Sequence, residues 1–277
     1  MSGDIGQTLM TYFGFLLRFL VIPILVFLAI TYWDNKNNKP THGFNNGRAV
    51  WIGIAIHIFL AVAYTTPWDN YLVATGVWYY NPALVTGIVF GYVPIEEYTF
   101  FVLETILTGL WWWFLIRRIR PSEKQFTPNK GIIYWSAGLL VITWIVFTYL
   151  FFSDNAPITY LSITLFWALP PILPQLLFGS DILWHRRKLV ALSIIVPAIY
   201  LSLMDVIALR ATTWSISPQQ TTGILFFGIL PIEEVTFFFI TNILIGFGMT
   251  LLLAHESQSR IQEIKMNINQ WRKSWKH

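Results

Sequence analysis

The chain has 277 residues, of which 55% are hydrophobic and only 12% are charged, and its formal net charge is +4. Soluble domains usually contain about 25% charged residues, so this composition excludes an ordinary soluble protein and predicts an integral membrane protein. The mean hydropathy of +0.57 agrees with that prediction. The chain contains no cysteine, which excludes disulfides, thiolate nucleophiles and cysteine-ligated metal sites.

Seven apolar runs are long enough to cross a bilayer, which takes about 20 helical residues. The first run is too long for the core of a signal peptide and has no basic segment before it, so we expect it to be retained. The third and seventh runs are longer than a bilayer requires and are expected to tilt, kink or protrude. The expected spans are 10–33, 48–67, 83–116, 131–152, 158–179, 188–209 and 221–254.

Basic residues predict the orientation of these spans. They concentrate in the loops after the first, third and fifth spans and after the seventh span, whereas Arg210 lies on the opposite side. By the positive-inside rule, we expect a multi-pass protein of the cell membrane with its N-terminus outside and its C-terminus in the cytoplasm. Because the basic residues fit topology, the lipid bilayer is an expected partner and nucleic acid is not.

One phrase occurs twice, as PIEEYTFF at 94–101 and PIEEVTFF at 231–238, and one residue is inserted just before the second copy. Other matched pairs are Asp69 with Asp205, Trp78 with Trp214, Tyr12 with Tyr160, Pro23 with Pro171, and Gly109 with Gly246. A single connector span returns the chain to its starting side, so the two copies are expected to be parallel. We therefore predict an all-α integral membrane protein of seven transmembrane helices, built as two parallel three-helix repeats.

The repeat divides the chain into four parts. The expected parts are a first repeat over 1–120, a connector with span 4 over 121–156, a second repeat over 157–255 and a basic cytoplasmic tail over 256–277. The tail mixes basic residues with tryptophan, which predicts an anchor at the cytoplasmic leaflet, with partner docking as the alternative.

The repeated phrase places adjacent acids, Glu96 with Glu97 and Glu233 with Glu234, about 13 residues into their expected spans, hence near mid-depth. A charge there costs at least about 2.5–3.5 kcal/mol. Desolvation and the neighbouring carboxylate both disfavour the charged form, so we expect at least one glutamate of each pair to be protonated at neutral pH. A protonated carboxyl group in a dry site is a candidate proton donor.

Pro94 and Pro231 lie two residues before the first acid of each pair. Inside a helix, a proline leaves the carbonyl four residues earlier without its donor, so kinks are expected that free the carbonyl groups of Phe90 and Phe227. A protonated glutamate can donate to such a carbonyl, so the alternative is that the acids only cap loose backbone. Two copies at matched depth, each with more acid than capping requires, favour a functional site.

Three further acids are candidates for the same site. Asp69 and Asp205 lie near the outer ends of spans 2 and 6, where a site role and interfacial solvation are alternatives. Glu104 lies seven residues after Glu97, on nearly the same helix face, and its repeat partner is Thr241. The two halves are therefore expected to differ in their chemistry.

Phenylalanines follow both acid pairs, namely Phe100, Phe101, Phe237 and Phe238. Aromatic faces stabilise cations, and apolar walls exclude water. Carboxylic acids, aromatic faces and a lipophilic pocket together suit the protonation of an alkene and the steering of the resulting carbocation.

The doubled P-x-E-E phrase in two three-span halves resembles the membrane carotenoid cyclases of the lycopene cyclase-domain family. In that family the halves occur as separate subunits or fused, and this chain is similar to the fused form over nearly all its length. The resemblance implies an isomerase (an intramolecular lyase) that turns lycopene into β-carotene through γ-carotene, without redox change, cofactor or metal. The family's acids carry over to Glu96, Glu97, Glu233 and Glu234.

The other candidate residues named above would support the site or bind the substrate. Lycopene, the bilayer and other carotenoid-pathway enzymes are the implied partners. Flavoprotein lycopene cyclases are a different class, because this chain has no G-x-G-x-x-G fingerprint.

Three alternatives remain open at the level of the sequence. The same fold can form a monocyclic, an ε-ring or a C50 product, depending on where the base lies. A proton-coupled transporter can also use paired glutamates as a relay. A retinal-binding protein is disfavoured, because its Schiff base requires a lysine and span 7, at 221–254, contains none.

Overall fold

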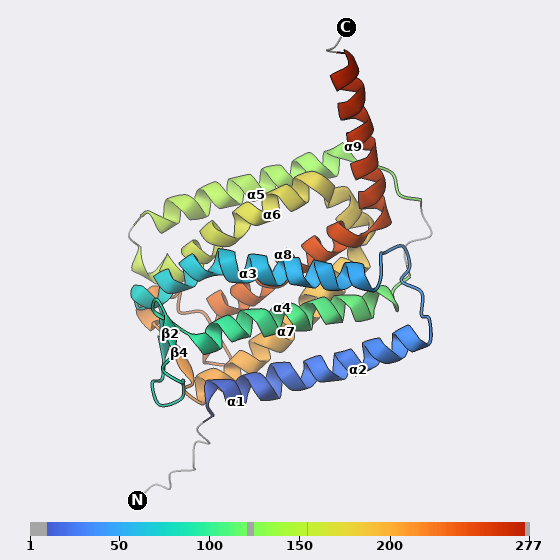
Figure 1. The fold of residues 1–277 in the computed structure, drawn as a ribbon. Helices are drawn as coiled ribbons and strands as arrows, with labels where there is room; N and C mark the ends of the chain where they lie inside the picture. The colour runs from blue at the N-terminus through green and yellow to red at the C-terminus, as the bar shows by residue number, and fades with distance from the viewer. Residues whose placement is uncertain (1–9, 121–124, 154, 275–277) are drawn as a thin grey trace, which may run out of the picture.

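The protein is a bundle of seven long helices lying side by side, described here by a computed structural model over residues 10–120, 125–153 and 155–274 (Figure 1). Within these residues, seven helical segments are long and apolar enough to cross a membrane, as the composition predicts for a multi-pass membrane protein. The helices are α1 (Tyr12–Leu16), the π-helical turn η1 (Leu17–Val21), α2 (Ile22–Lys36), α3 (Arg48–Ala74), α4 (Ile95–Ile116), α5 (Lys130–Phe151), α6 (Thr159–His185), α7 (Arg187–Arg210), α8 (Ile232–Leu253) and α9 (His255–Ser274).

The bundle has a buried centre and a lipid-facing periphery. In the most apolar stretches of α4, α7 and α8, 67%, 56% and 50% of the residues are buried, against 11% for α5. α5 packs along α6 at the edge, and α9 leads away from the bundle (Figure 1). The helices that carry the repeated phrases, α4 and α8, are therefore two of the three most buried helices.

Short strands close one end of the bundle, which we call the strand end. β1 and β4 form an antiparallel pair in which Tyr79 lies opposite Ser215. Two small hairpins lie immediately before α4 and α8. The short elements are β1 (Trp78–Tyr80), β2 (Val89–Phe90), β3 (Val93–Pro94), η2 (Ala156–Ile158), β4 (Trp214–Ile216), η3 (Pro218–Gln220), β5 (Leu225–Phe226) and β6 (Leu230–Pro231).

The expected starts of spans 3 and 7, at residues 83 and 221, are wrong, because α4 begins at Ile95 and α8 at Ile232. The apolar residues before these points form loops and hairpins. The expected proline kinks are also wrong. Pro94 and Pro231 are N-caps with extended backbone, where the missing N–H and the fixed φ of proline cost least. The four glutamates therefore lie in first turns and not at mid-helix.

The residue inserted before the second copy of the phrase lies in a hairpin turn. The first hairpin turns through two residues, with Gly91 at a φ of 67°, whereas the second needs three residues between Phe226 and Leu230. The first turn is tied to α3, because the backbone N–H of Tyr92 donates to Asn70 Oδ1 at 2.8 Å. The insertion is absorbed in the turn, and both helices still start directly after their proline.

Two glycines allow close helix contacts in the centre of the bundle. A Cβ at Gly109 of α4 would lie 2.7 Å from Ile54 Cγ1 of α3, and a Cβ at Gly246 of α8 would lie 2.8 Å from Ser193 Oγ of α7. Such approaches through small residues are typical of packing between membrane helices.

Gly109→Leu should therefore lower the thermal unfolding midpoint of the protein in detergent, consistent with an overpacking cost of about 1–3 kcal/mol. Gly138→Leu is the matched control, because Gly138 is exposed on α5 and a Cβ there meets no atom within 4 Å. The midpoint is measured as the loss of the monodisperse peak in size-exclusion chromatography after heating. Equal midpoints for the two variants would contradict the tight α3–α4 contact.

Candidate active site

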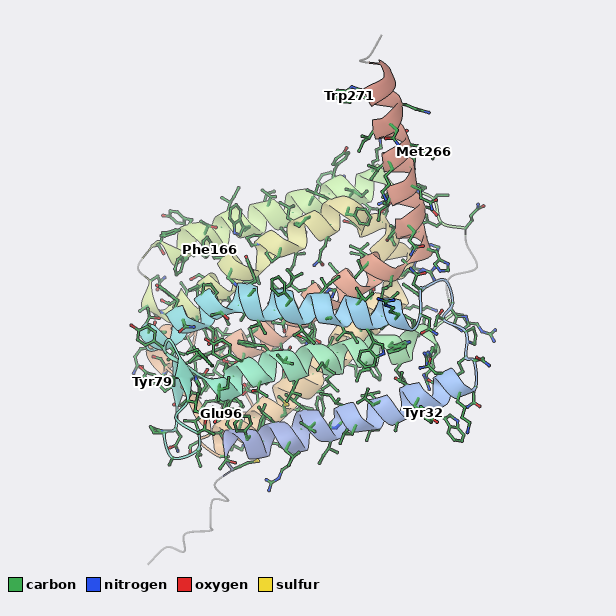
Figure 2. All side chains as sticks on the ribbon, viewed as in Figure 1. Tyr32, Tyr79, Glu96, Phe166, Met266 and Trp271 are labelled. Carbon is green, nitrogen blue, oxygen red and sulfur yellow. The ribbon has the colours of Figure 1, made fainter. Side chains whose placement is uncertain are left out.

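The first turns of α4 and α8 carry the two glutamate pairs at the strand end of the bundle, where Figure 2 labels Glu96. Free backbone N–H groups and the helix dipole favour negative groups at this position. All four side chains are buried, with exposed fractions of 6% or less. The helix starts therefore bring four carboxyl groups out of water, and their other contacts decide what each can do.

The first glutamate of each pair holds the loop before its own helix. Glu96 Oε1 accepts a hydrogen bond from the backbone N–H of Thr86 at 2.6 Å, and Glu233 Oε1 accepts one from Thr222 at 2.7 Å. Neither residue lines the cavity described below. Glu96 and Glu233 thus fix the approach of the chain to each helix start.

Glu97 accepts hydrogen bonds from two phenol groups. Its Oε2 binds the hydroxyl of Tyr12, from α1, and the hydroxyl of Tyr80, from β1, the latter at 3.1 Å. Burial, together with the negative charges of Glu97 and Asp69, raises the pKa of Tyr80 well above its ordinary value. The Tyr80 phenol therefore remains a hydrogen-bond donor at neutral pH.

Glu234 has an equivalent pair of donors. Its Oε1 accepts from the hydroxyl of Tyr160, in α6, at 2.7 Å and from the indole N–H of Trp78, in β1, at 3.1 Å. Tyr160 is the repeat partner of Tyr12, so each half supplies a tyrosine to its own second glutamate. Trp78 comes from the first half of the chain, so β1 reaches across to the acid of the second half.

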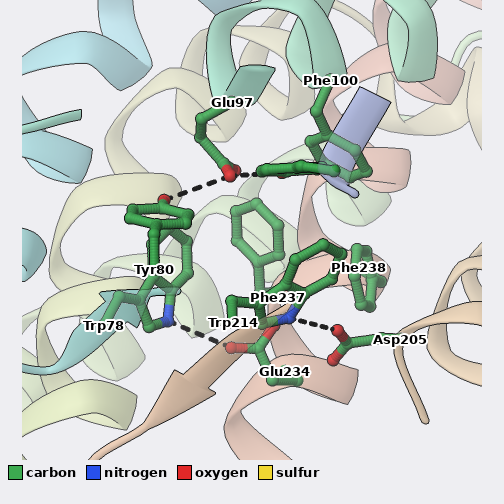
Figure 3. A pocket seen from close by; sticks show the side chains of 10 residues that line it. Trp78, Tyr80, Glu97, Phe100, Asp205, Trp214, Glu234, Phe237 and Phe238 are labelled. Atoms are coloured by element: carbon green, nitrogen blue, oxygen red, sulfur yellow. Dashed lines mark hydrogen bonds between the residues drawn. The ribbon is translucent and has the colours of Figure 1, made fainter. Parts of the chain in front are cut away.

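Glu97 and Glu234 converge on one small cavity of about 30 Å³, which we call the acid chamber (Figure 3). A cavity of this size holds about one water molecule. Its walls are otherwise largely aromatic. The lining residues are Tyr12, Trp78, Tyr80, Glu97, Phe100, Asp205, Trp214, Glu234, Phe237 and Phe238.

Two aspartates are also buried at this end of the bundle, and they differ. Asp205 lines the acid chamber and accepts from the indole N–H of Trp214 at 2.8 Å, while its Oδ2 has no partner among the described residues. Asp69 is fully buried, and neither of its oxygens has a hydrogen-bond partner within the same residues. Asp69 is not part of the chamber lining. The chamber therefore presents three carboxyl groups.

Ion pairs lie at the opposite end of the bundle. In the part of the chain that the structure describes, the paired carboxylates are Asp34 with Arg117, Arg118 and Lys39, Asp181 with Arg260, and Glu256 with Arg186 and His185. The chamber acids instead bind phenol and indole donors. A positive charge developing in the chamber would thus meet carboxyl groups that no neighbouring cation neutralises.

A second, larger cavity of about 390 Å³ lies between α3, α4, α6 and α8, and we call it the groove. Glu104 lines the groove and its Oε1 accepts from the hydroxyl of Thr241, its repeat partner, at 2.9 Å. Phe101 also lines the groove and not the chamber, whereas Phe237 lines both cavities. Among the predicted site residues, the structure therefore places some in two adjoining cavities, whereas Glu96, Glu233, Asp69, Pro94 and Pro231 line neither.

The hydrogen-bond donors of the chamber were not predicted as site residues. They are Tyr12, Tyr80, Tyr160, Trp78 and Trp214. Four of them form two matched pairs of the repeat, Tyr12 with Tyr160 and Trp78 with Trp214, and this match could have identified them from the sequence. Tyr80 has isoleucine at the corresponding position, so the repeat gave no signal for it.

Comparison with known proteins identifies related chains. The protein is 37% identical over 217 residues to a Halobacterium salinarum protein named lycopene beta-cyclase, covering 75% of this chain and 85% of the relative. Proteins named bifunctional lycopene cyclase/phytoene synthase are also similar. That of Podospora anserina is 35% identical over 68% of this chain and 32% of its own length, and that of Blakeslea trispora is 30% identical over 87% and 38%.

No protein-family model and no solved structure matches the chain. The archaeal relative is nevertheless similar over most of both sequences, and the two fungal proteins match 68% and 87% of this chain. The doubled acid motif and the seven apolar helices agree with that similarity. The chain therefore belongs to the lycopene cyclase family of membrane proteins.

Proposed function

We propose that the protein is a lycopene β-cyclase, which closes the acyclic ends of lycopene to β-ionone rings and forms β-carotene by way of γ-carotene. The observation that carries this proposal is the convergence of Glu97, Glu234 and Asp205 on one aromatic chamber, whose lining within the described residues contains no cationic side chain. The names of the relatives support the same substrate and ring type.

The proposed reaction is an isomerisation driven by acid–base catalysis. One carboxyl group of the chamber gives its proton to the terminal double bond, which leaves a tertiary carbocation. The electrons of a second double bond attack this carbon, so the ring closes and the charge moves onto the ring. A second carboxylate removes a ring proton, and the freed electron pair becomes the ring double bond. One proton is consumed and one is released, so we propose that neither a cofactor nor a metal is required.

The aromatic walls suit a cationic intermediate. The rings of Phe100, Phe237 and Phe238 line the chamber, and all three side chains are at most 4% exposed. Aromatic faces attract cations, and more strongly where water is excluded. The same exclusion of water protects the carbocation from being captured as an alcohol.

The proposed architecture is a pair of parallel repeats, over 1–120 and 157–255, with their two-fold axis along the bilayer normal. Matched hydrogen bonds support it: the Tyr64 hydroxyl donates to the Trp167 carbonyl at 2.8 Å, and the Tyr200 hydroxyl to the Phe19 carbonyl at 2.7 Å. In both cases the carbonyl lacks its helical donor, because proline follows four residues later, at 171 and at 23.

We further propose a location in the cell membrane, with the N-terminus and the strand end outside and the C-terminus in the cytoplasm. The distribution of basic residues supports this orientation. The acid chamber then lies toward the outer leaflet, within reach of a substrate dissolved in the bilayer.

A lycopene-accumulating bacterium that expresses the chain should convert lycopene to β-carotene. The measurement is chromatography of the extracted pigments with absorption spectra. A catalytically dead variant, Glu97→Gln with Glu234→Gln, is the control for pigment changes caused by expression alone. Unchanged lycopene, with the protein present in the membrane, would contradict the proposed cyclase activity. A product that consists only of γ-carotene, or only of carotenoids with ε-rings, would contradict the proposed formation of β-carotene.

Glutamine substitutions should distinguish the roles of the two glutamates of each pair by their effects on the rate. Glu97→Gln and Glu234→Gln should each lower the initial rate of lycopene loss by about 10²–10⁴, the usual contribution of a general acid or base. Glu96→Gln should cost much less, because glutamine keeps an oxygen that accepts from the Thr86 N–H. The rate is measured in membranes with matched amounts of protein. Equal losses at positions 96 and 97 would contradict the division of roles.

Tyr80→Phe should lower the rate by about tenfold or more, since a hydrogen bond to a charged group contributes about 1.5–3 kcal/mol. We assign Glu97 as the base, so the variant should also raise the share of ε-rings, because a displaced Glu97 removes a different ring proton. Tyr79→Phe is the matched control, since the neighbouring Tyr79 side chain is 52% exposed. An unchanged isomer ratio in Tyr80→Phe would show that Tyr80 does not position the base.

A further inference from the structure

The groove is an apolar cavity with a mouth on the outer face of the bundle. Leu60 and Tyr64 of α3 line it and remain 52% and 40% exposed, which places them where lipid surrounds the protein. Prolines at 170, 171 and 174 interrupt the hydrogen bonding of α6, which forms the opposite wall. The mouth therefore opens sideways into the bilayer, between α3 and α6.

The polar groups of the groove are mostly satisfied inside the protein. Glu104 Oε1 accepts from Thr241, and His57 Nδ1 lies 2.7 Å from the carbonyl oxygen of Gly53. Gln175 donates to the Leu244 carbonyl at 3.3 Å, while its Oε1 has no partner among the described residues. Because nearly all these groups already have partners, the groove is suited to a ligand without polar groups, which gains by burying its apolar surface.

Stacked aromatic rings connect the mouth of the groove to the acid chamber. The ring of Tyr64 stacks on Trp167 at 5.6 Å, and Trp167 stacks on Trp68 at 4.5 Å. Trp68 then stacks on Phe237 at 5.3 Å, with planes 9° apart. Phe237 is the wall shared by the groove and the chamber. Trp68 lines neither cavity, so the stack is a rigid aromatic wall of which Tyr64, Trp167 and Phe237 border the groove.

The α3–α6 side of this path is fixed by reciprocal hydrogen bonds. The Tyr64 hydroxyl donates to the Trp167 carbonyl at 2.8 Å, and the Trp167 indole donates to the Tyr64 carbonyl at 3.2 Å. On the far side of α6, the indole of Trp144 donates to the Phe166 carbonyl at 3.0 Å, which Pro170 leaves without a helical donor. The prolines therefore shape the wall without leaving these two carbonyls unpaired.

We propose that the groove admits the linear polyene from the bilayer and presents one of its ends, past Phe237, to the acid chamber. This inference rests on the proposed cyclase function and adds the route and the order of events. Both second glutamates line one chamber, so the protein treats one end of the substrate at a time. A molecule with one ring closed must leave the groove and return with its other end first.

The test fills the groove from α3. Ala61 lines the groove and Ala63, two residues later, is exposed and does not. Ala61→Trp should lower the rate of lycopene loss by about 10²-fold, the cost of a misplaced substrate, while Ala63→Trp stays near the wild-type rate. Leu244→Trp fills the groove from α8 and should act like Ala61→Trp, so a folding failure at one site does not decide the result. Equal rates in all three variants and wild type would overturn the route.

A binding measurement separates access from chemistry. In the Glu97→Gln, Glu234→Gln background, protein purified from a lycopene-accumulating bacterium should carry lycopene, detected by its absorption bands. Adding Ala61→Trp should remove the pigment, and adding Ala63→Trp should not. Pigment retained with Ala61→Trp would overturn the route even if the rate falls. If wild type forms no cyclic carotenoid at all, the proposed function fails, whatever the binding result.

The order of events has its own readout. With lycopene in large excess over wild-type protein, free γ-carotene should exceed β-carotene at early times, because each closed ring requires a separate visit. β-Carotene formed from the start, with no free monocyclic product, would overturn the separate visits and leave the route to be judged by the tryptophan variants.

Discussion

The fold depends on one constraint, which is that carboxyl groups are buried at the starts of α4 and α8 without a cation to pair with among the described residues. An unpaired buried carboxylate is costly, and breaking its hydrogen bonds makes the cost larger. The helix starts offer partial compensation through their free N–H groups and dipoles. The remaining compensation comes from specific donors: loop amides for Glu96 and Glu233, and phenol or indole groups for Glu97 and Glu234.

Strand β1 shows how the rest of the structure meets this constraint. Side chains two residues apart on a strand point to the same face, so Trp78 and Tyr80 both face inward while Tyr79 is 52% exposed. Trp78 donates to Glu234 and Tyr80 donates to Glu97. The three-residue strand β1 therefore connects the acids of α4 and α8. Pairing with β4 holds β1 in place. Strand β4 also carries Trp214, whose indole N–H donates to Asp205.

The sequence predicted the burial of the acids better than their position along the helices. Seven spans, the doubled phrase and the buried acids follow from hydropathy and repetition, because apolar runs and matched residues are visible in one dimension. The start of α4 was missed since residues 83–94 are as apolar as a helix, yet they form a loop and a hairpin. Hydropathy does not distinguish an apolar hairpin from a helix, although Gly91 and Pro94 mark the turn and the helix start.

Tyr80 was missed for a different reason. Tyrosine near the end of an apolar run is typical of a membrane interface, and the matched position in the second half is Ile216. Only the three-dimensional pairing of the strands shows that its hydroxyl reaches Glu97. The two glutamates of each phrase differ for a simpler reason, because adjacent residues of a helix point about 100° apart, so Glu96 turns to its loop and Glu97 to the chamber.

The doubled phrase gives the chain two acid motifs, yet geometry joins them in a single chamber. The first turns of α4 and α8 bring Glu97 and Glu234 together instead of placing them in separate pockets. A proton donor and a proton acceptor must perform different tasks on one substrate, and identical surroundings would not distinguish them. The departures from symmetry supply the difference: Tyr80 faces Glu97 where the other half has Ile216, and Glu104 stands where the other half has Thr241. In the proposed reaction, the two halves therefore form unequal sides of one site, so that one side can supply the proton and the other can accept it.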